Sequence, residues 1–277
     1  MSFEVIEPVG RETPVVVEIP HASVVLDALS VGTLKVPSYC IGQDADLYVD
    51  DLYVDAVECG ATVLVSKLSR YVCDLNRGEA DIDDGAVQGA PLGGRPAPHG
   101  LVWRQSTDGQ SALRSPLSQG EFERRLNTIY RPYHARLGEL IAAKVDRFGV
   151  AVLLAAHSMP SSGRHGHIDT GSRRADVVPG SRGRSTAAPI VIQQPEELAR
   201  ARGWSVAHDD PYRGGFTTAR YGRPGQCVHA VQVELNRHLY MNEETLEKLD
   251  GKFDATRQYC RELVARLAAL PLEALGP

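Results

Sequence analysis

Short apolar runs alternate with segments of helical periodicity along this 277-residue chain. Val15–Ile19 is a β-branched run that ends at Pro20, and this predicts a buried strand leading into a loop. Further strands are predicted at 61–65, at 150–156, which is the most apolar of them, and at 229–235, where Val231 and Val233 face inward. Weaker strand signals occur at 71–73, 189–192 and 204–206.

Helices are expected at 46–57, 119–148, 196–202 and 245–270. The second of these has apolar residues three and four positions apart, as in an amphipathic helix. Gly149 ends that helix and Pro271 ends the last one.

This order of elements predicts an α/β fold: a three-layer sandwich with a mostly parallel central sheet covered by helices on both faces. We expect one domain spanning residues 1–277. Two long loops interrupt it, at about 78–118 and 158–187, where Gly, Pro, Ser and Asp are frequent and no periodicity is visible. We expect the first loop to be either a lid or a poorly ordered segment.

Composition narrows the class of ligand. The formal charge is −5, and acidic and basic residues are interspersed, whereas a nucleic-acid surface needs clustered basic residues. A small-molecule substrate is therefore expected. Five cysteines without paired spacing indicate a reducing compartment, and no window approaches the roughly 20 apolar residues of a membrane span. These features predict a soluble cytoplasmic protein without a membrane partner.

Polar residues collect where the predicted strands end. His21 and His157 each follow a strand, the segment 74–77 closes another, and Glu234 lies near the end of a fourth. Ligands of open α/β sheets bind in the crevice at the carboxyl ends of the strands. The same edge of the sheet is therefore the expected site.

Two histidines and one acid are the ligand types of a catalytic zinc site. His21 and His157 fit this set, and Asp46 is one of four carboxylates that the segment 44–51 offers. The alternative is that each histidine is a hydrogen-bonded loop residue and that the acids cap a helix.

Asn76 and Arg77 form a pair suited to gripping a carboxylate, because a guanidinium bonds it bidentately and an amide adds a hydrogen bond. Arg77 could instead pair with Asp74 or Asp81. Glu234 lies in an apolar stretch, where an acid is costly unless it is paired, metal-linked or protonated. An edge strand with this side chain in water is the alternative.

The segment 213–222 is a glycine-bearing loop whose backbone could approach a ligand closely at Gly214 and Gly215, with Arg220 adding positive charge. An ordinary turn would have the same glycines. The chain has neither nucleotide-binding glycine motif nor a G-x-S-x-G elbow, which disfavours phosphate binding and a serine nucleophile.

Seven ordered motifs resemble the N-formylglutamate amidohydrolase family. They are Ile19-Pro20-His21-Ala22-Ser23, Asp44-Ala45-Asp46, Ser69 to Arg77, Pro132-Tyr133-His134, His157-Ser158-Met159, Gly214-Gly215 with Arg220-Tyr221-Gly222, and Gln232-Val233-Glu234 with Tyr240-Met241. The resemblance covers most of the chain.

This resemblance implies a fold related to zinc carboxypeptidases and aspartoacylase-like enzymes, and hydrolysis of N-formyl-L-glutamate in histidine degradation. It implies Zn²⁺ or another divalent metal as cofactor. By position, the metal ligands are His21, Asp46 and His157, the catalytic base is Glu234, and the substrate contacts are Asn76, Arg77, Arg220, Gly214 and Gly215.

One position departs from the pattern: Ala155 stands where the family usually has an Asp two residues before the second histidine. Acids that orient ligating histidines raise metal affinity roughly 10- to 100-fold. Two other functions therefore stay open. One is hydrolysis of a different N-acyl amino acid by the same metal set, and the other is small-molecule binding without catalysis on the same fold.

Overall fold

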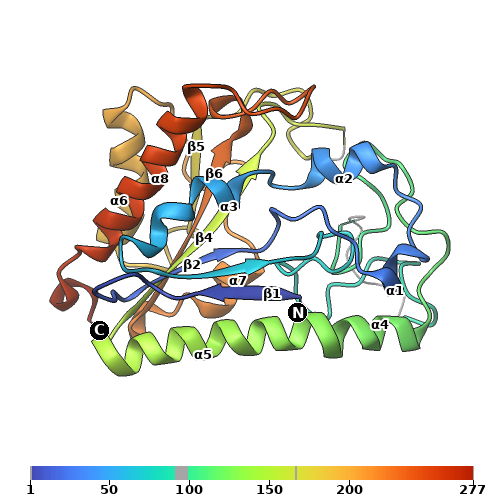
Figure 1. The fold of residues 1–277 in the computed structure, drawn as a ribbon, viewed down its shortest axis with the longest axis horizontal. Helices are drawn as coiled ribbons and strands as arrows, with labels where there is room; N and C mark the ends of the chain where they lie inside the picture. The colour runs from blue at the N-terminus through green and yellow to red at the C-terminus, as the bar shows by residue number, and fades with distance from the viewer. Residues whose placement is uncertain (1, 91–98, 166, 277) are drawn as a thin grey trace.

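A six-stranded sheet forms the centre of the computed structural model, which describes residues 2–90, 99–165 and 167–276. The strands are β1 (Phe3–Ile6), β2 (Val15–Ile19), β3 (Thr62–Ser66), β4 (Ala151–Met159), β5 (Val177–Gly180) and β6 (Val228–Asn236). Their order is β1-β3-β2-β4-β6-β5. The four central strands run parallel, and β1 and β5 are antiparallel at the two edges (Figure 1). The mostly parallel sheet is thereby confirmed.

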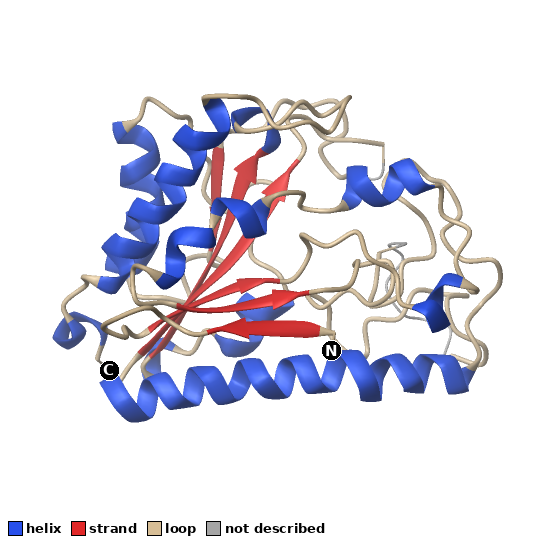
Figure 2. Cartoon of the chain, in the orientation of Figure 1, coloured by secondary structure: helices blue, strands red, loops and turns tan. Residues whose placement is uncertain are grey.

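Helices cover both faces of this sheet (Figure 2). They are α1 (Ala28–Val31), α2 (Ser38–Asp44), α3 (Val49–Leu52), α4 (Gln119–Arg125), α5 (Arg131–Phe148), α6 (Pro189–Ala201), α7 (Phe216–Tyr221) and α8 (Lys252–Ala268). A π-helical segment, Leu126–Tyr130, joins α4 to α5 into one long rod along the bottom of Figure 1. The helices α3, α6 and α8 pack on the opposite face.

Alternation along the strands divides the core into two parts. In β2, Val15, Val17 and Ile19 face the core under α6 and α8, whereas Val16 faces the core under α5. All five residues of β2 are buried, as expected for a parallel strand covered on both sides. Side chains on the α5 face near the carboxyl ends of β2, β4 and β6 are therefore held between the sheet and a helix.

The strands at 61–65, 150–156 and 229–235 were predicted within one to three residues of β3, β4 and β6. The main difference is at β4, which continues to Met159, so that His157 lies within the strand and not after it. Glu234 lies within β6 directly beside His157. Because β6 is an inner strand, the alternative of an edge strand with Glu234 in water is wrong.

The expected strand at 189–192 and the expected helix at 196–202 form one helix, α6. Pro189 occupies its first turn, where a missing N–H costs nothing. A four-residue apolar run fits a strand and a buried helix equally well. Val191, Ile192 and Leu198 are buried on one helix, so packing of this helix on the sheet determines the structure of the segment.

Other boundaries also differ. Residues 71–73 form a turn, and residues 204–206 contribute only a single β-bridge between Val206 and Val177. The helix expected at 46–57 is broken into α3 and a 3₁₀ turn, and α8 begins at Lys252 rather than at 245. The second long loop contains β5. The described part of the first loop has no helix or strand, and residues 91–98 of it lie outside the described residues.

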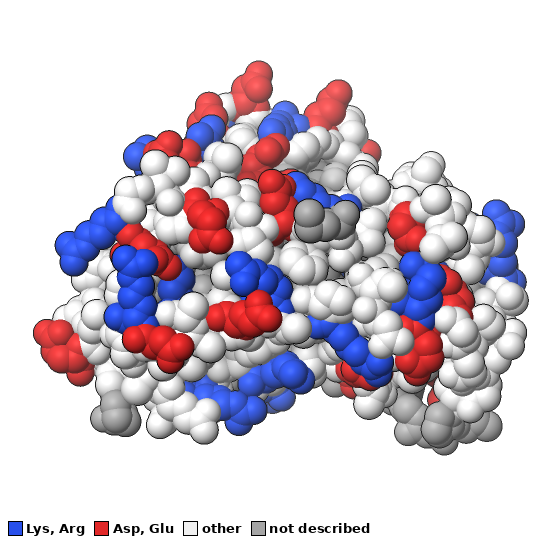
Figure 3. Space-filling model, turned by 60° about the horizontal axis from the view of Figure 1, so that its bottom comes forward, with Lys and Arg blue, Asp and Glu red and all other residues white. Residues whose placement is uncertain are grey.

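Charges of both signs are interspersed over the face that carries α5 (Figure 3). None of the described helices has the length and apolarity needed to cross a membrane.

Candidate active site

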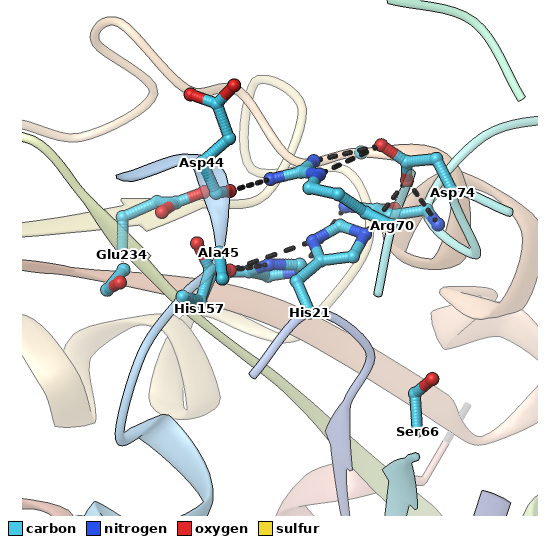
Figure 4. A network of polar contacts seen from close by, with 12 residues as sticks. His21, Asp44, Ala45, Ser66, Arg70, Asp74, His157 and Glu234 are labelled. Carbon is cyan, nitrogen blue, oxygen red and sulfur yellow. Dashed lines mark hydrogen bonds and ion pairs between the residues drawn. The ribbon is translucent and has the colours of Figure 1, made fainter. Parts of the chain in front are cut away.

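Two histidines and an aspartate meet at the carboxyl ends of the parallel strands. His21 follows β2, Asp46 follows α2, and His157 lies in β4. All three are buried, and their ligand atoms lie within 4.8 Å of one another. The Oδ2 atom of Asp46 is 3.6 Å from Nδ1 of His21 and 3.0 Å from Nδ1 of His157 (Figure 4). The residues predicted as metal ligands are thus brought together.

The donor set fits a divalent metal. Two imidazole nitrogens and one carboxylate oxygen are ligands that Zn²⁺ takes in catalytic sites with one position left open. The Nδ1 atom of His21 is buried and has no hydrogen-bond partner among the described residues, which is costly for a polar atom unless a ligand satisfies it. This atom lies 3.6 Å from Oδ2 of Asp46, on the side of the ring away from Asp74, where an ion could lie.

Asp74 fixes the ring of His21 from the other side. Its Oδ1 atom lies 2.8 Å from Nε2 of His21, so Nδ1 is the nitrogen that could bind a metal. Arg70 and Trp103 both donate to Oδ2 of Asp74, at 2.9 Å each. Burial opposes ionisation of Asp74, but the charges of Arg70 and His21 outweigh it and hold its pKa well below the usual range. The carboxylate therefore orients the ring of His21, as carboxylates do for histidines that bind metals.

Asp46 is held in a similar way. Arg237 donates from Nη2 to the Ala45 carbonyl at 2.7 Å and to Oδ1 of Asp46 at 3.3 Å. Burial alone would raise the pKa of Asp46, but hydrogen bonds and charge from His157 and His21 lower it far below its usual value. Asp46 is therefore an anion at neutral pH, as a metal ligand must be.

Glu234 is 6% exposed and lines the same cavity as His21, Asp46 and His157. Burial raises its pKa to about 7; the charge of His157 opposes this rise and that of Asp46 adds to it. Gln232 donates to Oε1 of Glu234 at 2.8 Å. The orientation of this amide is set because its own oxygen accepts the N–H of Gly215 at 2.8 Å. A carboxyl group with a pKa near 7 suits general acid–base chemistry.

Asn76 lies between the cluster and the loop before α7. Its Nδ2 atom is 3.3 Å from Nε2 of His157 and from Oε1 of Gln232. Its Oδ1 atom accepts the N–H of Thr217 at 3.1 Å, and this bond fixes which way the amide points. Gly215 packs directly on this amide. The predicted site residues Asn76, Gly214 and Gly215 therefore line one wall of the cavity.

The cavity has a volume of about 490 Å³, in the range of small-molecule sites. Among the described residues six arginines line it: Arg70, Arg77, Arg164, Arg182, Arg213 and Arg237. Such a lining favours an anionic ligand.

The two arginines predicted as substrate contacts lie in different places. Arg77 lines the cavity and donates to the carbonyls of His99 at 2.7 Å and Asn76 at 2.9 Å, not to Asp74. Arg220 does not line this cavity. Its guanidinium lies over the rings of Phe216 and Tyr221 and borders a second, shallower hollow. Arg220 thus lies outside the cavity that His21, Asp46 and His157 line.

Sequence reasoning gave no individual role at the site to Gln232, Arg182, Arg213 or Arg237, which line the cavity. Asp74 belongs to the polar segment 74–77 that the sequence places at this edge of the sheet, but its partner is His21 and not Arg77. Arg237 could not be found this way, since its contact with Asp46 joins segments 191 residues apart.

The fold and the site together define an α/β protein with a buried His–Asp–His group that could hold a metal ion at the carboxyl ends of its parallel strands. A family model described as N-formylglutamate amidohydrolase matches residues 13–241, and the chain belongs to this family. The resemblance found in the sequence is confirmed.

Named relatives agree with this assignment. The N-formylglutamate deformylase of Pseudomonas aeruginosa strain PAO1 is 32% identical over 265 residues, which are 94% of each chain. That of Pseudomonas putida is 31% identical over 83% of this chain and 82% of its own length. The crystal structure of N-formylglutamate amidohydrolase from Ralstonia eutropha JMP134 superposes with a TM-score of 0.86 at 31% identity, covering 96% of this chain and 97% of that one.

A gene product of Agrobacterium tumefaciens shares the fold. Its TM-score is 0.68 at 20% identity, over 97% of this chain and 95% of its own.

Proposed function

We propose that this protein hydrolyses N-formyl-L-glutamate to formate and L-glutamate, with a divalent metal held by His21, Asp46 and His157. The observation that carries the proposal is the buried His–Asp–His group beside a carboxyl group, Glu234, in an arginine-lined cavity. The names of the relatives supply the substrate. A cytoplasmic role in histidine degradation belongs to the same proposal.

A bound Zn²⁺ would supply a water activated toward a pKa near 7 and would polarise the amide carbonyl. Glu234 accepts the proton of the attacking water and returns it to the leaving amine nitrogen as the C–N bond breaks. Gln232 holds the Glu234 carboxyl in place through its 2.8 Å hydrogen bond. Asn76 and Arg77 hold the carboxylate next to the scissile amide, with the backbone at Gly214 and Gly215 forming the wall behind it.

His21 and His157 both have polar neighbours that hold their rings, although position 155 is an alanine. Asp74 bonds Nε2 of His21, and Asn76 contacts Nε2 of His157. These contacts support the metal-dependent reaction over a binding function without catalysis.

The test is a substrate panel with and without chelator. Purified protein is assayed for release of the free amino acid from N-formyl-L-glutamate, N-acetyl-L-glutamate and N-formyl-L-aspartate, and its metal is measured by elemental analysis. We expect the first substrate to give the highest kcat/KM, chelation to abolish turnover and Zn²⁺ to restore it. The Glu234→Gln variant should lose turnover while it keeps its metal. Turnover that survives complete metal removal would contradict the proposal.

A further inference from the structure

Two arginines at the mouth of the cavity lack an acidic partner. The side chains of Arg182 and Arg213 are exposed, and no carboxylate of the described chain forms an ion pair with either. Arg182 donates from Nη1 to the carbonyl of Gly214 at 3.1 Å. The Arg213 guanidinium makes no hydrogen bond within the described residues. Both charges are therefore available to a ligand.

The deeper arginines differ in this respect. Arg70 pairs with Asp74 at 2.9 Å, Arg164 with Asp44 at 3.0 Å, and Arg237 with Asp46 at 3.3 Å. Their positive charges are balanced within the protein. Among the cavity arginines, Arg182 and Arg213 are thus the two exposed ones without an ion pair in the described part of the chain.

The loops that carry the mouth pair are fixed to each other. The N–H of Arg182 donates to the carbonyl of Arg213 at 2.8 Å. A Cβ atom on Gly180 would lie 2.6 Å from the backbone nitrogen of Gly214, so the two loops are in close contact. Asp209 accepts the N–H groups of Ser181, at 2.7 Å, and of Gly183. The two guanidinium groups therefore extend from a rigid base, which lowers the cost of ordering them around a ligand.

We propose that Arg182 and Arg213 together bind the side-chain carboxylate of an acidic N-acyl amino acid. The reason is depth: Arg77 is half-buried next to Asn76, which contacts His157, whereas the mouth pair is exposed. The carboxylate attached to the same carbon as the scissile amide belongs near Arg77, and the carboxylate at the end of the side chain belongs at the mouth. Guanidinium groups bind carboxylates bidentately. This inference rests on the proposed hydrolase function and assigns its specificity.

The experiment compares two substrates that differ only in charge at the side-chain end, N-formyl-L-glutamate and N-formyl-L-glutamine. The Arg182→Gln/Arg213→Gln double variant should lose roughly 10- to 100-fold in kcat/KM on the first substrate, mainly through KM, and change less than about threefold on the second. Arg184→Gln is the matched control. Arg184 is an exposed arginine on the same loop, but it pairs with Glu196 at 2.8 Å and does not line the cavity.

An unchanged preference for glutamate over glutamine in the double variant overturns the inference, and so does an equal loss on both substrates. If the wild type hydrolyses neither substrate, the proposed function fails, and titration calorimetry with glutarate still tests the mouth pair. Glutarate binding at least tenfold tighter to the wild type than to the double variant supports it. Equal binding, or none to the wild type, overturns it.

Discussion

Gly215 leaves no room for a side chain beside Asn76. A Cβ atom at position 215 would lie 2.2 Å from Nδ2 of Asn76, far inside contact distance. Asn76 in turn is 3.3 Å from Nε2 of His157. The backbone before α7 thus sets the position of the Asn76 amide, which contacts His157.

Gly215→Ala should therefore impair catalysis more than folding. The new methyl group displaces the Asn76 amide, and a shift of about 1 Å at an active site costs on the order of 100-fold in rate. We expect kcat/KM for N-formyl-L-glutamate to fall by about that factor, with metal content unchanged. Gly138→Ala in α5 is the control, since nothing lies within 4 Å of its Cβ position. It should raise stability by roughly 0.5–1 kcal/mol and leave the rate alone. Equal rates for Gly215→Ala and the wild type would refute this role of Gly215.

The parallel strands and the proximity of the two histidines were predictable because each depends on a local signal. Apolar and β-branched residues mark β2, β3, β4 and β6, and the carboxyl ends of neighbouring parallel strands bring His21 near His157. Asp46 needed the family pattern, because four carboxylates at one helix start look alike in sequence. Asp46 differs from the other three in its contact with Arg237, which is 191 residues away in the chain.

The arginine contacts were harder to predict. Residues 213–222 looked like one glycine loop, but 216–221 fold into α7. The helical turn buries Thr217 and Thr218 and leaves Arg220 on the outer side, whereas Arg213, before the helix, faces the cavity. A six-residue helix has no periodicity that a sequence can reveal, so the packing of α7 on β6 decides which of the two arginines lines the cavity.

Asp74→Asn should weaken metal binding. The amide cannot supply the charge that orients His21 and balances Arg70, so we expect the metal Kd to rise roughly 10- to 100-fold. Competition with a chromophoric chelator measures this Kd. Asp55→Asn is the control. Asp55 forms a 2.7 Å ion pair with Arg257 and does not belong to the cavity, so its loss should leave the metal Kd unchanged. A normal Kd in Asp74→Asn would show that the carboxylate does not tune the site.

Glu18 introduces a pH-dependent stability. It is fully buried on β2, is the register partner of Ala155, and accepts a 3.2 Å hydrogen bond from Tyr133. Burial raises its pKa from 4.5 to about 7, against the opposing charge of His157. A raised folded-state pKa means that the unfolded chain ionises first as pH increases. The contribution of Glu18 to the free energy of unfolding is fully present below about pH 4.5 and is lost as the pH rises through about 7.

Glu18→Gln should remove this slope, because the amide resembles the protonated acid and does not ionise. The difference in unfolding free energy between variant and wild type should grow in favour of the variant by about 2–3 kcal/mol from pH 4.5 to pH 8. Urea denaturation at several pH values measures it. Glu4→Gln, at an exposed position beside Lys67, should run parallel to the wild type. Parallel curves for Glu18→Gln as well would mean that Glu18 ionises normally.

Metal removal should lower thermal stability. Without an ion, the buried Nδ1 atom of His21 has no hydrogen-bond partner in the described chain, and nothing offsets its burial. A metal that binds only the folded state adds about 4 kcal/mol when its free concentration is 1,000 times the Kd. We expect chelator to lower the melting temperature of the wild type and Zn²⁺ to restore it. In His21→Ala and His157→Ala the chelator should have no effect, because these variants lack a ligand. A melting temperature that is the same in all conditions for the wild type would remove the three residues from the metal site.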